Sequence, residues 1–208
     1  QRPYAAVGIR EQQLKECIND LVLNGVLEPG DSSFTSPVFF VTKKTADGAT
    51  GQKGRLCYDY RSINRLIKSK NHPLASTKHF FNNLQQYNVF SLIDVKNAFL
   101  SIPLTEEAKK YLAITTPFGI YLPTRTPFGL KSSPSAFNFA MSKVLGDLPF
   151  CNVYMDDIAI GAANNEEMIK HLKIVMSRLH KFNLKIQLSK TKFFLNPFRP
   201  KCHFCALL

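Results

Sequence analysis

Two adjacent acidic residues interrupt an otherwise apolar, β-rich segment, and this feature constrains the fold of the chain more than any other. Asp156 and Asp157 follow Tyr154 and Met155, between two arms rich in β-branched and aromatic residues. Such arms predict a β-hairpin over 150–162 with the acids at its turn. Along a strand the two carboxylates would point to opposite faces, whereas at a hairpin turn both can face one point. An exposed Asp-Asp turn is the simpler interpretation of this motif taken alone.

A third carboxylate has the same kind of setting. Asp94 follows the apolar run VFSLI, which predicts a buried strand that ends at the acid. Neighbouring carboxylates that stay ionised need a compensating cation, because otherwise one of their pKa values rises steeply. Oxygen ligands suit Mg²⁺. Three carboxylates from two strand ends are what two-metal nucleotidyl transfer requires, so we expect two Mg²⁺ ions, with Mn²⁺ as a substitute.

The charge of the chain points to a polyanionic partner. Lys and Arg number 27 against 15 Asp and Glu, which gives a formal net charge of +12. Residues 168–208 contain nine Lys or Arg and no acid, and residues 53–78 contain seven basic residues and one acid, Asp59. Nucleic acid is the first candidate and an anionic membrane surface the second, with a generally basic surface as the plain alternative.

Several features indicate where the protein works. No apolar run approaches the roughly 20 residues that span a bilayer, so we expect no membrane partner. The first ten residues lack an apolar segment typical of a signal peptide and there is no initiator Met, which indicates a piece of a longer or processed product. Five cysteines, an odd number, favour a reducing compartment. Cys202 and Cys205 resemble half of a zinc site, a weak signal without a second pair.

Strand and helix patterns alternate without a steady βαβ period, which favours an α+β fold. Apolar spacings of three and four predict helices over 10–24 and 165–182. A Ser or Thr cap predicts a helix over 76–84, and Ser133-Pro134 predicts the start of one over 133–146. Strands are expected over 38–44, 55–60, 88–94 and 184–195, and short strands over 98–104 and 109–129. A turn is expected over 28–33, and a polar, basic stretch over 61–67.

Six blocks in one order resemble the reverse transcriptases of gypsy-type LTR retrotransposons and retroviruses. They are SPVFFVTKK, GRLCYDYRSIN, SLIDVKNAFLSIPL, TPFGLKSSPSAF, YMDD and LKIQLSKTKFF, and the resemblance covers roughly residues 10–195. It implies an α+β right-hand polymerase made of fingers and a ferredoxin-like palm, with the thumb absent. The fingers would comprise 1–68 and 102–132, and the palm 69–101 and 133–208.

The resemblance implies the RNA-directed DNA polymerase domain of a retroelement polyprotein. Such a domain extends a primer 3′-hydroxyl with dNTPs on an RNA or DNA template. Thumb or connection, RNase H, protease and integrase domains are expected in the rest of the polyprotein. The location is expected to be intracellular and cytoplasmic, in a virus-like particle. A catalytically silent nucleic-acid-binding remnant is the alternative; a cellular RNA-templated RNA polymerase would share the paired acids but not the order of the blocks.

The resemblance also assigns catalytic roles. Asp94, Asp156 and Asp157 would be the catalytic, metal-binding carboxylates, with the Val95 carbonyl as a further metal ligand. A lysine in the last block would protonate the departing pyrophosphate as a general acid, and the two candidates are Lys190 and Lys192.

The remaining assignments concern the nucleotide and the template-primer. Arg55 would grip the triphosphate, since its guanidinium fork fits phosphate oxygens. Phe99 would be the aromatic gate under the sugar. Further nucleotide contacts are expected from Lys43 or Lys44, from the backbone N–H groups of Lys96 and Asn97, and from Phe128, Gly129 and Met155. Template or primer contacts are expected from Arg61, Pro134 and Tyr154. As plain alternatives, the aromatic residues would be core residues and the arginines solvated charges.

Overall fold

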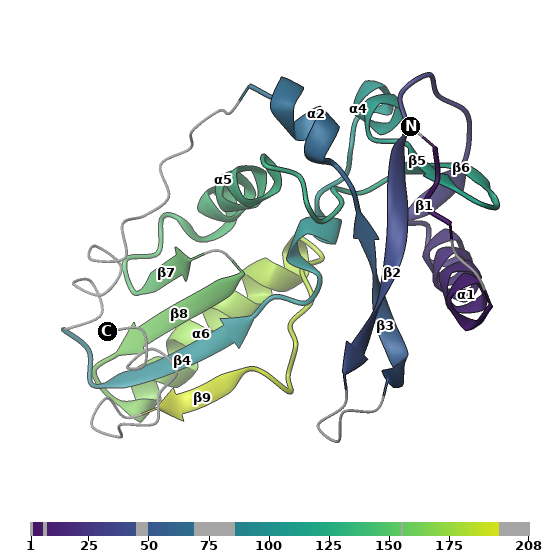
Figure 1. Ribbon diagram of the computed structural model, residues 1–208. Helices are drawn as coiled ribbons and strands as arrows, with labels where there is room; N and C mark the ends of the chain where they lie inside the picture. The colour runs from purple at the N-terminus through teal and green to yellow at the C-terminus, as the bar shows by residue number, and fades with distance from the viewer. Residues whose placement is uncertain (1, 6–7, 45–49, 69–85, 155, 196–208) are drawn as a thin grey trace. The chain divides into compact units, whose positions relative to one another are not determined.

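The computed structural model describes residues 2–5, 8–44, 50–68, 86–154 and 156–195, except for the side chains of 42–44 and 50–53. The chain divides into two compact units. Unit 1 comprises Gln1–Ser69 and Ile102–Ser133, and unit 2 comprises Lys70–Ser101 and Pro134–Leu208. Each unit combines helices with a sheet (Figure 1), so the α+β prediction is confirmed. Among the described residues, no helix has the length and apolar character needed to cross a membrane.

Unit 1 is built on a five-stranded sheet with the strand order β1-β6-β5-β2-β3. The long strands β2 and β3 form an antiparallel hairpin, and β2 also pairs with β5 in parallel. In this hairpin Gly54 is needed, because a Cβ atom there would collide with the Phe40 ring. The bounds are β1 Leu27–Pro29, β2 Ser36–Lys44, β3 Thr50–Tyr58, β5 Ile114–Thr116 and β6 Gly119–Pro123.

Three helices accompany this sheet. The helix predicted over 10–24 is confirmed as α1 (Ile9–Leu23), and the basic stretch after β3 contains α2 (Arg61–Leu66). The short strands predicted within 109–129 are confirmed as β5 and β6, whereas the helix α4 (Glu106–Tyr111), which overlaps the first residues of this stretch, was not predicted. The Thr105 side chain caps α4 by accepting a hydrogen bond from the Ala108 N–H, a local signal that outweighs β propensity. The turn expected over 28–33 is wrong at its start, because Glu28 and Pro29 belong to β1.

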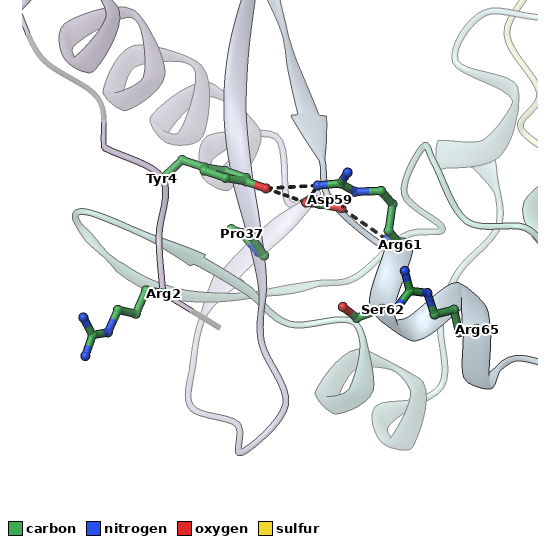
Figure 2. A pocket seen from close by; sticks show the side chains of 7 residues that line it. All are labelled: Arg2, Tyr4, Pro37, Asp59, Arg61, Ser62 and Arg65. Atoms are coloured by element: carbon green, nitrogen blue, oxygen red, sulfur yellow. Dashed lines mark hydrogen bonds and ion pairs between the residues drawn. The ribbon is translucent and has the colours of Figure 1, made fainter.

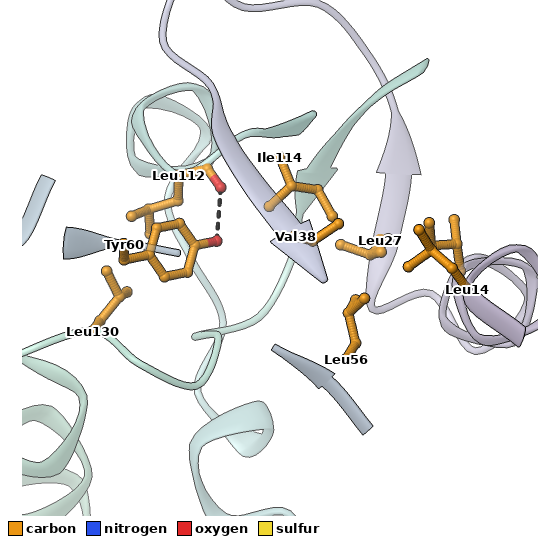
Figure 3. Close-up of a cluster of buried hydrophobic side chains, with 9 residues drawn as sticks. Leu14, Leu27, Val38, Leu56, Tyr60, Leu112, Ile114 and Leu130 are labelled. Atoms are coloured by element: carbon orange, nitrogen blue, oxygen red, sulfur yellow. Dashed lines mark hydrogen bonds between the residues drawn. The ribbon is translucent and has the colours of Figure 1, made fainter. Parts of the chain in front are cut away.

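The core of unit 1 surrounds Tyr60 (Figure 3), whose side chain is almost completely buried. The Tyr60 ring stacks on Tyr58, with centroids 5.6 Å apart, and its hydroxyl donates a hydrogen bond to the Leu112 carbonyl at 2.9 Å. A buried hydroxyl is costly unless it is bonded, so this bond fixes the chain after β3 to the end of α4. The other buried members of the cluster are Leu14, Ile18, Leu27, Val38, Leu56, Leu112, Ile114 and Leu130.

Replacing Tyr60 with Phe should destabilise the protein by roughly 1–3 kcal/mol, because the buried Leu112 carbonyl loses its donor while the aromatic ring remains. Urea unfolding followed by circular dichroism measures the change in midpoint. An unchanged midpoint and slope would show that the hydroxyl contributes nothing to the core of unit 1.

Unit 2 contains a four-stranded antiparallel sheet with the order β7-β8-β4-β9. Its elements follow a β-α-β-β-α-β order along the chain: β4 Val89–Asp94, α5 Ser133–Leu145, β7 Cys151–Tyr154, β8 Asp157–Ala162, α6 Asn165–Lys181 and β9 Lys192–Leu195. The predicted hairpin and the predicted helices over 133–146 and 165–182 are confirmed. The strand expected from residue 98 is wrong, because Ala98–Ser101 form the 3₁₀ turn η1. The helix predicted over 76–84 lies outside the described residues.

The two faces of the unit 2 sheet differ in burial. The Ser91 hydroxyl of β4 donates a hydrogen bond to the Met168 sulfur of α6 at 3.2 Å, so one face of β4 packs against α6 (Figure 1). Successive strand residues point to opposite faces, which places Asp94 on the other face. The register of β4 and β8 makes Asp94 the partner of Asp157. The helix-covered face buries Ile93, Ile158 and Ile160 completely.

Candidate active site

Three carboxylates meet at one end of the β4–β8 pair. Asp94 is the last residue of β4 and Asp157 the first residue of β8, and they are partners across the antiparallel pair. Directly opposite residues have Cβ atoms about 4.5–5.5 Å apart, so the register alone brings two like charges together. Asp156 lies in the turn before β8, and its carbonyl accepts a hydrogen bond from the Val95 N–H at 3.1 Å. The predicted convergence of the paired acids with the third strand-end carboxylate is therefore present within unit 2.

Burial and mutual repulsion raise the pKa values of the paired acids. For Asp156 burial is the larger cause, followed by repulsion from Asp157 and Asp94. Partial burial and repulsion from Asp94 raise the pKa of Asp157 in the same direction. One carboxylate oxygen of Asp156, Oδ1, is buried and accepts no hydrogen bond from the described residues. A buried acceptor without a donor is costly, so this site favours a positive ligand.

Lys190 supplies the positive charge nearest to these acids. Its Nζ lies 3.2 Å from Asp94 Oδ2, and it lowers the raised pKa values of Asp156 and Asp157. The Lys190 side chain is 68% exposed, whereas that of Asp94 is 19% exposed, so the lysine reaches in from solvent. Of the two predicted general acids, Lys190 is thus the one that forms an ion pair with the site. Lys192 begins β9, is exposed, and pairs with Leu92.

The segment before Lys190 is fastened to the end of β4 by backbone hydrogen bonds. The Gln187 N–H donates to the Asp94 carbonyl at 2.8 Å, and the Lys96 N–H donates to the Lys185 carbonyl at 2.7 Å. The Lys96 N–H, which is predicted to face a phosphate, thus donates to the Lys185 carbonyl in this structure, and its contact with a phosphate stays a prediction. The sequence carries no local signal for these contacts, since the segments are about 90 residues apart.

The carboxylates fit a divalent cation by their chemistry. They supply oxygen ligands, which Mg²⁺ prefers, and the unsatisfied Asp156 Oδ1 would gain a partner from a bound cation. Within the described part of the chain, no three acidic, histidine or cysteine side chains are arranged to hold a metal ion. Asp94 instead pairs with Lys190. Two Mg²⁺ ions therefore remain a prediction, as does the role of the Val95 carbonyl as a ligand.

Phe99 lies five residues after Asp94, in η1. Its half-buried ring meets Phe137 of α5 edge-on, with centroids 6.1 Å apart. In the segment that joins Asp94 to Phe99, Asn97 has φ = 51°. This left-handed conformation is uncommon outside glycine and turns the chain sharply. The contact with Phe137 fixes the orientation of Phe99, which both a gate under the sugar and a core aromatic require.

Two further residues predicted for the site also belong to unit 2. Tyr154 ends β7, is half-buried, and packs with the cluster around Ala159. Pro134 lies in the first turn of α5 and is half-buried. Met155 lies outside the described residues, and so does the Cys202–Cys205 tail.

The other predicted nucleotide and template residues belong to unit 1. Arg55 is exposed in β3, and Phe128 is 43% exposed. Gly129 has φ = 87°, and its carbonyl accepts a hydrogen bond from the Asn64 side chain at 2.8 Å. Lys43 and Lys44 end β2, but their side chains are not among those described.

Arg61, predicted to lie near the template, belongs to a hydrogen-bonded cluster in unit 1 (Figure 2). Its guanidinium donates to both carboxylate oxygens of Asp59, at 2.8 and 2.7 Å. The Tyr4 hydroxyl donates to the same carboxylate at 2.6 Å. These hydrogen bonds hold the pKa of Asp59 well below its usual range. No local pattern in the sequence indicates Tyr4 as a partner of Asp59, because the two residues are 55 positions apart.

Comparison with known proteins identifies similar sequences and structures. The family model described as "Reverse transcriptase (RNA-dependent DNA polymerase)" matches residues 41–204. The chain is 29% identical over 205 residues to the retrovirus-related Pol polyprotein from transposon 412 of Drosophila melanogaster, covering 98% of the chain and 17% of that protein. It is 29% identical over 179 residues to the corresponding polyprotein from transposon gypsy of the same organism, covering 85% and 17%.

Solved structures of prototype foamy virus protease-reverse transcriptase are also similar. The native structure has a TM-score of 0.82 and 26% identity, covering 93% of this chain and 25% of that chain. A foamy viral protease-reverse transcriptase in complex with an RNA/DNA hybrid gives the same values. The chain thus spans less than a fifth of the polyproteins and a quarter of these solved chains.

The raised pKa of Asp156 predicts that Asp156→Asn stabilises the protein at neutral pH. A raised folded-state pKa means that ionisation destabilises the folded state as pH rises through that pKa, and Asn removes this charge. Thermal unfolding in a chelator should therefore give a higher midpoint for the variant at neutral pH. The gain should vanish below about pH 4, where Asp is neutral in both states. A midpoint gain no larger than that of Asp31→Asn, a change at an exposed acid, would contradict the repulsion.

Proposed function

The chain belongs to the reverse transcriptase (RNA-dependent DNA polymerase) family, and we propose that it extends a primer 3′-hydroxyl with dNTPs on an RNA or DNA template. The observation that carries the proposal is the register that sets Asp94 opposite Asp157. Asp156 lies beside them, and its buried Oδ1 has no donor among the described residues. The long Pol polyproteins among its relatives support a place within such a polyprotein. Thumb or connection, RNase H, protease and integrase domains would then lie in the rest of that product.

The carboxylate cluster is the proposed catalytic centre. Asp94, Asp156 and Asp157 would hold two Mg²⁺ ions, with the Val95 carbonyl as a further oxygen. Bound there, the ions supply activation of the primer hydroxyl and neutralisation of the charge on the phosphates. The repulsion among the carboxylates supports this assignment, because a divalent cation relieves it.

Lys190 is the favoured general acid, with Lys192 as the second candidate. Its Nζ already lies 3.2 Å from Asp94 Oδ2, at the edge of the proposed centre. The exposed ammonium group would turn from Asp94 toward the negative charge of the phosphates. It would then donate a proton from Nζ to the departing pyrophosphate.

The two compact units have proposed roles as the fingers and the palm. Unit 2 would be a ferredoxin-like palm, an assignment supported by its β-α-β-β-α-β order and the strand order β7-β8-β4-β9. Unit 1 would be the fingers and would supply the exposed Arg55 to the triphosphate. The other nucleotide contacts proposed for unit 1 are Lys43, Lys44, Phe128 and Gly129.

A template-primer duplex is the proposed macromolecular partner. The formal net charge of +12 suits a polymer of phosphates. The similar foamy viral protein has been solved with an RNA/DNA hybrid and with double-stranded DNA, which supports a duplex partner for this chain. Arg61, Pro134 and Tyr154 are the residues proposed to contact it.

Replacing Asp156 with Asn should abolish primer extension and leave duplex binding intact. The carboxylate would hold metal, whereas lysines and arginines distributed over the chain would hold the duplex. Loss of a charged metal ligand should lower the rate by at least about 10³-fold. Magnesium-dependent extension and filter binding measure the two properties, with Asp31→Asn as the control at an exposed acid. Extension by Asp156→Asn at the wild-type rate, or no extension by the wild type, would contradict the proposal.

Replacing Phe99 with Val should relax selection against ribonucleotides. An aromatic ring under the sugar would clash with a 2′-hydroxyl. This clash would reduce incorporation of the rNTP much more than incorporation of the dNTP. We expect rNTP incorporation to rise by at least about tenfold, with a modest fall for dNTP. Single-nucleotide extension with both substrate series measures the ratio. An unchanged ratio would show that Phe99 is a core residue, and Phe128 would be tested next.

A further inference from the structure

The solvent-exposed side of α6 carries a row of three lysines. Lys170, Lys173 and Lys181 are all exposed. Successive helix residues turn by about 100°, so the three side chains project from one side of α6, within about 80° around its axis. From the first to the last they follow the helix axis for about 16 Å. We call these three side chains the lysine row.

Neighbouring acids do not compensate the charge of the lysine row. Among the described residues none of the three lysines forms an ion pair, and the chain contains no acid after Glu167. Glu167 accepts a hydrogen bond from the Ala163 N–H at 2.6 Å, and Arg178 donates to Asp147. Within α6 this leaves only Glu166, in the first turn, to oppose the row. The lysine row therefore keeps a net positive charge.

The helix α1 has a different charge pattern, although its length is similar. It has 15 residues against 17 in α6. Its charged residues have mixed signs: Arg10, Glu11, Lys15, Glu16 and Asp20. Like charges three or four residues apart destabilise a helix, and Lys170 and Lys173 are such a pair. The helix dipole accounts for Lys181, in the last turn, but not for the other two. The lysine row thus costs α6 some stability, and a polyanionic ligand would offset this cost.

The lysine row lies on the far side of unit 2 from the carboxylates. The apolar side of α6 buries Met168, Val175 and Leu179, and the Ser91 hydroxyl of β4 reaches the Met168 sulfur (Figure 1). Asp94 is on the opposite face of the sheet. One layer of helix, about 10 Å thick, and the sheet itself therefore separate the lysine row from the carboxylates. A nucleic-acid segment held at the carboxylates is thus a different segment from one held at the row.

The make-up of this surface favours a phosphate backbone as its ligand. Lysine is depleted at the centre of protein–protein interfaces, whereas here lysines form the centre and the exposed Ile169 and Ile174 lie at the two borders. Lysine ammonium groups are compact point charges that bind phosphate oxygens without reading bases. An anionic membrane also attracts lysines, but a helix that binds a membrane inserts its apolar side. The apolar side of α6 is already packed against the sheet.

We propose that the lysine row binds the phosphate backbone of a second nucleic-acid segment, apart from the one at the candidate active site. Such binding is independent of base sequence and weakens steeply with salt. This site goes beyond the proposed function, because it requires neither the carboxylates nor primer extension. Through it, one chain could hold one part of a long nucleic acid on α6 while another part occupies the opposite face of unit 2.

Lysine acetylation read by mass spectrometry tests the site on the unaltered full chain, because bound nucleic acid protects the lysines that it covers. With a saturating short DNA duplex at low salt, Lys170, Lys173 and Lys181 should each be acetylated several-fold more slowly than without it. Lys15, an exposed lysine of α1, should react at an unchanged rate. A short RNA duplex should protect the same three lysines, because both polymers present a phosphate backbone.

A double variant measures what the row contributes to affinity. Lys170→Gln/Lys173→Gln should reduce the log–log salt slope of duplex binding by about two, since each lysine would neutralise one phosphate. Arg10→Gln/Lys15→Gln removes two exposed positive charges from α1 and should leave the slope unchanged. The α6 variant should unfold at no lower temperature than the wild type, because it removes a like-charge pair. At saturating primer-template it should extend primers at the wild-type rate, because the carboxylates lie on the other face of the sheet.

Several results would overturn the inference. They are unchanged acetylation of all three lysines in the presence of duplex, protection by anionic vesicles but not by duplex, and an equal loss of salt slope in the α1 control. Slower extension by Lys170→Gln/Lys173→Gln at saturating primer-template would assign the row to the candidate active site and would also contradict it. A wild type that fails to extend primers but has a protected lysine row would contradict the proposed function and support this site. Extension without protection would contradict the site alone.

Discussion

The antiparallel register of β4 and β8 is the constraint on which the rest of the site depends. It sets Asp94 opposite Asp157, an arrangement that costs free energy because like charges directly opposite each other repel. The opposite face of the same strands buries Ile93 and Ile158 completely. A slip of one residue would move this apolar set to the other face of the sheet, away from α6, so hydrophobic packing on one face fixes the register that gathers carboxylates on the other.

The repulsion among these carboxylates favours a positive charge beside them. Lys190 offsets part of this repulsion through its ion pair with Asp94. Asp156 Oδ1 is buried and still has no hydrogen-bond donor within the described part of the chain. Natural proteins accept such local instability where function requires it. The segment that leads to Lys190 and β9 is held at the end of β4, because the Gln187 N–H donates a hydrogen bond to the Asp94 carbonyl. The position of β9 therefore depends on that of the carboxylates.

Local signals explain what could be predicted from the sequence. The β-branched arms around Asp156 predict the hairpin, and α6 has both an apolar face and a capping residue, Asn164, which accepts a hydrogen bond from the Glu167 N–H. Contacts between distant segments could not be predicted in this way. Lys190 lies 96 residues after Asp94 in the sequence and contacts it in the fold. This contact favours Lys190 over Lys192 as the general acid, and no local pattern in the sequence predicts it.

Calorimetric titration with Mn²⁺ tests the central claim most directly, because it measures the carboxylate cluster without template, primer or catalysis. The account predicts that the wild type binds Mn²⁺, that Asp94→Asn loses this binding, and that Lys190→Met binds more tightly since the competing ammonium group is gone. Asp31→Asn, at an exposed acid, should bind as the wild type does. Equal Mn²⁺ affinity in the wild type and Asp94→Asn would contradict the account, because the register of β4 and β8 would then gather carboxylates that hold no cation.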